Sequence, residues 1–204
     1  MKNIMSSLAT VADRPDALER RPLISNSVAG TILFVFTEVM LFAGFISAHM
    51  VYVSNQVGEL WPPADQPLLP FRQTALNSSA LMISGLVLFM AWRAFRSERR
   101  EARGLLGLAT LLGLFFVGSQ GVEWLALIRE GLTLTSSAYG AFFYMIVGAH
   151  AIHALGGILA LVWAWFRLSA GQLSGAQFAS VQVFWYFVVA VWPVIFLQVY
   201  GYGM

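Results

Sequence analysis

The residues of this sequence that could support chemistry lie inside apolar segments. The stretch FTEVMLFAGFISAHM, residues 36–50, holds Glu38 and His49 and no other ionisable side chain. Glu123 lies in a later apolar segment, and His150 and His153 lie in the next one. Carboxylates and imidazoles inside a membrane carry protons, hold metal ions or pair with one another. These five residues are therefore the candidate site.

Their spacing predicts which of them share a helix face. Glu38 and His49 are 11 positions apart, about three helical turns, so one face carries both. His150 and His153 stand at i and i+3 and also share a face. Counted from the ends of their segments, Glu38 lies roughly 15 Å deep and His150 roughly 18 Å deep from the opposite side. We expect Glu38 to meet His150 or His153 near the midplane, where a hydrogen bond offsets its desolvation.

The other polar side chains favour structural roles. We expect Glu123, close to the outer end of its segment and next to Gln120, to bond in the region of Tyr139 or to water. We expect His49 to be a hydrated or capping group at the outer end of its segment. For Glu38, a buried hydrogen-bonding role is favoured over a proton carrier, because a proton relay needs a chain of polar partners.

The ligand inventory limits what this chain can catalyse. A bundle that holds two haems needs about four axial ligands on facing helices, whereas the sequence has three histidines and no cysteine. No catalytic serine constellation, P-loop or glycine-rich nucleotide motif is present. We therefore expect no catalytic residue, no metal ligand and no cofactor-binding residue in this chain.

The elements that must position these residues are transmembrane helices. The 204 residues are 58% hydrophobic and only 11% charged, far from the globular norm of roughly 25% charged residues. Apolar segments long enough to cross a bilayer cover residues 28–54, 73–95, 104–128, 138–166 and 178–202. The sequence predicts an all-α membrane protein, a five-helix bundle over 28–204 preceded by a short tail, 1–27. Glycines such as Gly44 and Gly113 should let the helix backbones approach closely.

The basic residues predict the orientation of the bundle. Ten of the twelve lie in the N-terminal tail, between the second and third segments, or at Arg167, whereas the opposite side has only Arg72 and Arg129. By the positive-inside rule the N-terminus is cytoplasmic and the C-terminus is outside. The basic stretch WRAFRSERREAR, residues 92–103, is therefore expected to anchor the loop at the membrane rather than to bind nucleic acid.

Several motifs together resemble cytochrome c oxidase subunit III. TEVMLFAGFISAHMVY, residues 37–52, is similar to a helix of that family in which a serine or threonine and a glutamate precede a histidine. The family's Trp-Pro-Pro loop and its next helix resemble the stretch GELWPPADQPLLPFRQTALNSSALMISG. Residues 120–161 resemble three further parts of the family: its segment with Gln and Glu-Tyr, its Tyr-Gly loop and its helix with two histidines. The resemblance covers about 28–204 and is closest to the short five-helix bacterial form. One departure is in the last helix, where Tyr186 and Val189 replace the usual histidine and aspartate.

The resemblance implies a function and its partners. The chain would be a non-catalytic accessory subunit of a haem-copper respiratory oxidase, packed on subunit I beside other subunits of the respiratory complex. Haem and copper would reside in those partner subunits, and phospholipid would bind between the helices. The matched positions that carry over are Glu38, Glu123, His150 and His153. The expected location is the bacterial plasma membrane.

Two alternatives remain open at this stage. The chain could serve a nitric oxide reductase or a quinol-oxidising supercomplex as a subunit of the same type. It could also be a small transporter, although five segments do not divide into the paired repeats common in transporters.

Overall fold

The computed structural model describes residues 25–56, 61, 63 and 66–201, and these form five long helices. They are α2 (Asn26–Asn55), α3 (Phe71–Arg96), α4 (Glu101–Arg129), α5 (Ala138–Ser169) and α6 (Gly175–Tyr200). All five are long and apolar enough to cross a membrane. Every predicted segment end lies within three residues of the observed helix end, so the all-α, five-helix prediction is confirmed. Most of the predicted tail, 1–27, lies outside the described residues.

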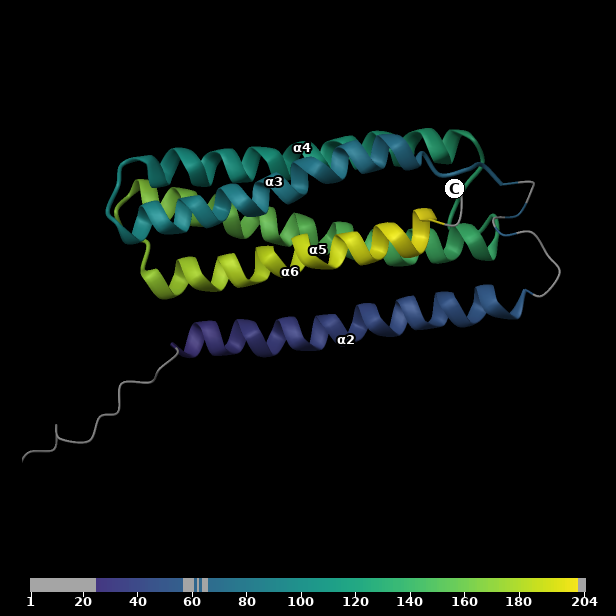
Figure 1. Ribbon diagram of the computed structural model, residues 1–204, viewed down its shortest axis with the longest axis horizontal. Helices are drawn as coiled ribbons and strands as arrows, with labels where there is room; N and C mark the ends of the chain where they lie inside the picture. The colour runs from purple at the N-terminus through teal and green to yellow at the C-terminus, as the bar shows by residue number, and fades with distance from the viewer. Residues whose placement is uncertain (1–24, 57–60, 62, 64–65, 202–204) are drawn as a thin grey trace, which may run out of the picture.

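The helices alternate in direction along one common axis. The start of α2, the α3–α4 turn and the α5–α6 turn lie at one end, and the α4–α5 connection and the end of α6 lie at the other (Figure 1). The first group of connections is the one that carries most of the basic residues. Which end faces the cytoplasm stays a prediction from that charge bias.

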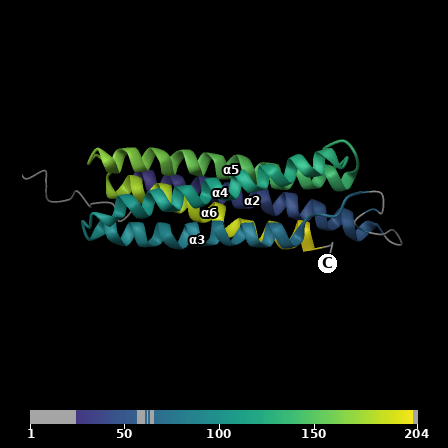
Figure 2. The same cartoon turned by 90° about the horizontal axis from the view of Figure 1, so that it is seen from above.

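Four helices form the packed core and the fifth lies against it. The most extensive contacts join α3 to α4, and α6 contacts α2, α3 and α5. Figure 1 shows α2 along one side of the bundle next to α6, and in Figure 2 it lies behind the other helices, between α5 and α3 in that view. Along α2, only Phe42 and His49 are buried, so most of this helix faces outward.

Serine side chains cap the first turns of three helices, α2 through Ser25, α5 through Ser137 and α6 through Ser174. Ser137 Oγ accepts from the Gly140 N–H at 3.0 Å at the start of α5. Ser174 and Gln177 form a reciprocal capping box at the start of α6. Such caps satisfy N–H groups that have no partner within the helix. They place the first turn of α5, and hence His150 and His153, in a fixed register.

The glycine prediction needs correction. A Cβ added at Gly44 would meet nothing within 4 Å, so this glycine is not at a close approach. At Gly113 and Gly157 an added Cβ would come within 2.7 Å of the indole ring of Trp185. These two glycines make room for a tryptophan from α6 rather than for a neighbouring backbone. The indole is completely buried, and its Nε1–H donates to Ser84 Oγ on α3 at 3.1 Å.

Candidate functional site

The structure brings Glu38 of α2 together with His153 of α5. Glu38 Oε2 and His153 Nε2 lie 2.8 Å apart, and both side chains are largely buried, with exposed fractions of 16% and 15%. The rings of Phe42 and Phe187 lie 5.3 and 5.8 Å from the imidazole. Of the two histidines predicted as partners for Glu38, His153 makes the contact.

A second hydrogen bond shows that one ring nitrogen of His153, Nδ1, carries a proton. Its Nδ1 lies 2.7 Å from the carbonyl oxygen of Ala149, one turn earlier on α5. A carbonyl can only accept, so Nδ1 carries a proton and donates it. The remaining proton of the pair lies between Nε2 and the Glu38 carboxyl, either on the imidazole as an ion pair or on the carboxyl as a neutral pair. In both forms the pair has no net charge, which limits its cost inside a membrane.

His150 lies one turn before His153 and is enclosed by aromatic rings. Its ring packs against that of Trp192, with centroids 4.9 Å apart and the two planes tilted by 32°. Phe42 and Phe116 pack edge-on against it at 6.3 Å. Only 2% of the residue is exposed. Its Nε2 has no hydrogen-bond partner among the described residues. His150 is therefore a packing residue of the α4, α5 and α6 core rather than the partner of Glu38.

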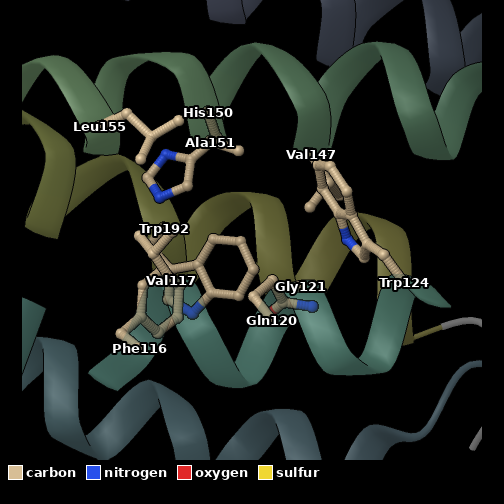
Figure 3. A pocket seen from close by; sticks show the side chains of 10 residues that line it. All are labelled: Phe116, Val117, Gln120, Gly121, Trp124, Val147, His150, Ala151, Leu155 and Trp192. Carbon is tan, nitrogen blue, oxygen red and sulfur yellow. The ribbon is translucent and has the colours of Figure 1, made fainter. Parts of the chain in front are cut away.

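A cavity of about 130 Å³ lies beside His150, between α4 and α5. Figure 3 shows His150 and Trp124 toward opposite ends of this space, with Gly121 near its middle in that view. Its walls are mostly apolar and include Phe116, Val147 and Leu155 on these two helices. The space is partly open rather than sealed, and its volume would accommodate a small hydrocarbon group.

Glu123 belongs to a separate cluster that joins α3, α4 and α6. Its Oε2 accepts from Thr74 Oγ1 at 2.8 Å and from Gln120 Nε2 at 2.9 Å. The same amide donates to the hydroxyl of Tyr200 at 3.0 Å. Glu123 makes no direct hydrogen bond to Tyr139, and its bonds run instead to Thr74 and Gln120. A bond from Glu123 to water stays a prediction.

His49 is buried, as expected of a polar residue inside an apolar segment, and is not exposed to water at the end of that segment. Its exposed fraction is 2%, and the rings of Phe142 and Trp61 lie 5.3 and 6.0 Å away. Tyr52 contacts the same two rings. The Trp61 ring lies against the imidazole, so His49 is a buried part of an aromatic cluster.

The described residues do not bring three histidine, aspartate or glutamate side chains together in a way that could hold a metal ion. Glu38 and His153 contact each other, His150 is enclosed by rings, and His49 lies near the far end of α2. What this arrangement can do is hold helices together through uncharged or internally neutralised polar pairs.

Sequence reasoning missed Thr74, Tyr200, Ser84 and Trp185 as parts of these polar clusters. Thr74 and Tyr200 stand 49 and 77 positions from Glu123, so no local pattern joins them to it. The one available signal was the i, i+3 spacing of Gln120 and Glu123, which places both on one face.

The two positions where the last helix departs from the usual motif have new partners. The Tyr186 hydroxyl accepts from Gln182 Nε2 at 2.7 Å within α6. Val189 packs against Gly85 of α3, where an added Cβ would lie 3.2 Å from its methyl group. Val189 therefore contributes helix packing where a charged side chain would need a polar partner.

The fold and the buried polar pairs define an integral membrane protein whose helices carry few ionisable groups. Residues 23–204 match the model of the family described as cytochrome c oxidase subunit III. The chain belongs to this family, as its motifs predicted.

Relatives of known identity agree along nearly the whole chain. A probable cytochrome c oxidase subunit 3 of Mycobacterium leprae is 32% identical over 207 residues, which covers 98% of each chain. The cytochrome c oxidase subunit 3 of Corynebacterium diphtheriae is 33% identical and covers 92% of each. The cytochrome c oxidase subunit 3 of Latimeria chalumnae is 30% identical, and the match covers 85% of this chain and 69% of the relative.

Proposed function

We propose that this chain is a non-catalytic accessory subunit of a haem-copper respiratory oxidase, in contact with the subunit that holds the haems and copper. The observation that carries the proposal is the family match over residues 23–204. The names of the relatives favour an oxidase over the nitric oxide reductase and transporter alternatives. Electron transfer and oxygen binding belong to partner chains, because the histidines here are used in packing and in the Glu38 pair.

In this role the chain stabilises its catalytic partner and binds lipid. Support for lipid binding comes from an apolar groove of about 470 Å³ between α2 and α6. Its walls include Val39 and Ile46 of α2 and Val194 of α6. Aliphatic walls that face the bilayer suit an acyl chain. The membrane is then the bacterial plasma membrane, where the oxidase couples oxygen reduction to proton pumping.

The test is purification of the affinity-tagged chain from its native membrane in a mild detergent. The expected result is a stoichiometric complex with a subunit that shows haem absorption and contains copper. Recovery of this chain alone, or as an oligomer of itself with no haem-containing partner, would overturn the proposal.

A further inference from the structure

A second groove, between α3 and α4, combines apolar edges with a polar floor. It has a volume of about 420 Å³. Leu76, Phe115 and Val122 form the edges, with exposed fractions of 76%, 61% and 68%. The polar groups of the lining belong to Asn77, Ser119 and Glu123 and, two residues after the start of α3, to Gln73. Large exposed apolar residues are expected on a membrane-facing surface, but a carboxylate, an amide and a hydroxyl between them are not.

Several hydrogen-bonding groups of this floor are uncommitted. Both hydrogen bonds to Glu123 end on Oε2, and Oε1 accepts none from the described residues. Asn77 uses Nδ2 to donate to the Phe116 carbonyl at 3.1 Å, while its Oδ1 has no partner in the described part of the chain. Ser119 forms no hydrogen bond with any described residue, unlike Ser78 and Ser79, which bond back to their own helix.

These groups lie below the ends of their helices. Asn77 stands six residues after the start of α3, and Glu123 stands six residues before the end of α4, so both are about 9 Å from the helix ends. Acyl chains cannot hydrogen-bond to them, and unsatisfied polar groups are costly in hydrocarbon. Asn77 Oδ1 is itself fully buried, so the uncommitted acceptor that an occupant can reach is the Glu123 carboxylate oxygen Oε1. The matching occupant supplies N–H or O–H donors.

We propose that this groove receives a transmembrane helix of a partner subunit and that this helix presents a hydrogen-bond donor to Glu123. Lysine and arginine are the donors that best match a carboxylate. The inference rests on the proposed function, which supplies a partner subunit. A helix fits because Phe115 and Val122, at i and i+7, form an edge about two turns long. Polar side chains that bond across helices are a recurrent means of association in membranes.

Photo-crosslinking in the purified complex tests the contact. In the test variants, a photoreactive residue replaces Leu76 or Val122 in the groove. In the matched control, the same residue replaces Ile152 of α5, whose side chain is 71% exposed. The expected result is that both groove positions crosslink to one transmembrane helix of the co-purified subunit, one that carries a donor side chain, and that position 152 does not. Crosslinks from the groove to lipid alone, or to a segment outside the membrane, would overturn the inference.

A pair of matched substitutions tests it independently. Ser119→Leu fills the groove without removing a hydrogen bond. Ser79→Leu places the same side chain at an exposed position of α3 outside the groove and removes only the bond from Ser79 to the Leu76 carbonyl of its own helix. We expect S119L to lower retention of the partner during detergent washing by about tenfold, the scale of one lost interhelical contact, and S79L to leave it unchanged. Equal retention would contradict the inference.

The two proposals fail in different ways. If the unmodified chain co-purifies with no haem-containing subunit, the proposed function fails. If that subunit co-purifies but crosslinks only elsewhere, the docking inference alone fails.

Discussion

Trp185 on α6 donates a hydrogen bond from Nε1 to Ser84 Oγ on α3, at 3.1 Å. The same serine hydroxyl donates to the Ala109 carbonyl of α4 at 2.7 Å. One buried hydroxyl thus joins three helices, and Gly113 and Gly157 leave the space that the indole fills. This contact links α3, α4 and α6, and Gly157 adds α5 to the surroundings of the indole.

The space around Trp185 gives the first prediction. Gly157→Ala places a Cβ 2.7 Å from the indole ring, so overpacking should destabilise the fold by about 1–3 kcal/mol. Gly156→Ala is the control, because its Cβ would meet nothing closer than 3.8 Å. Thermal unfolding in detergent micelles measures both. If the two variants melt at the same temperature, the indole is not confined as described.

The cavity beside His150 gives the second prediction. Gly121 lines it, and a Cβ there meets nothing within 4 Å, so Gly121→Leu should fill apolar space and raise stability by about 0.5–2 kcal/mol. Gly118→Leu is the matched control on the same helix, where the added side chain faces outward. Both substitutions replace glycine by leucine within a helix and gain the same helix propensity. The difference between their unfolding temperatures therefore measures the effect of filling the cavity. A variant at 121 less stable than the one at 118 would contradict this.

The positive-inside asymmetry gives the third prediction. Because the sequence has no cysteine, Ser97→Cys and Thr135→Cys each provide a single thiol, one at each end of the bundle (Figure 1). A membrane-impermeant maleimide added to intact cells should label position 135 and not position 97. Labelling of 97 instead would invert the orientation, and labelling of both would contradict five spans.

The ligand inventory gives the fourth prediction. The isolated chain should bind no stoichiometric haem, copper or iron, because its histidines are held in packing contacts and in the Glu38 pair. Metal analysis and a visible absorption spectrum of the purified chain provide the measurement. A haem absorption band that saturates at one haem per chain would contradict the expectation.

Helix length and polarity could be predicted from the sequence because bilayer thickness imposes them residue by residue. The meeting of Glu38 with a histidine of α5 followed from helical rise and the alternation of direction. The choice of His153 over His150 did not, because it depends on the rotation of α5, which Trp192 and Phe116 help to set by packing on His150.

Other features depend on residues too distant to pair by pattern. The burial of His49 involves the ring of Trp61, which lies outside α2. The partners of Glu123 come from α3 and, through Gln120, from the last residue of α6. Tertiary contacts of this kind leave no local periodicity in the sequence, so the depth of Glu123 alone could not name Thr74 or Tyr200 as parts of its cluster.

The Glu38 and His153 pair gives the last prediction. Glu38→Ala leaves a cavity and deprives His153 Nε2 of its partner, at a cost of about 1–3 kcal/mol. Glu38→Gln should be much milder. Because His153 donates from Nδ1 to Ala149, its neutral ring can accept at Nε2 from the amide of the new glutamine.

The oxidase complex separates this structural role from proton transfer. With Glu38→Ala, it should start turnover near the normal rate, because the redox centres are proposed to lie in partner chains. It should then lose activity or release this subunit faster on heating or delipidation, and Glu38→Gln should follow the unmodified complex. Oxygen consumption, recorded together with subunit composition, measures both effects. The glutamine amide keeps the hydrogen bond but cannot exchange a proton as a carboxyl group does. If Glu38→Gln stopped turnover at once in an intact complex, Glu38 would therefore be a proton carrier.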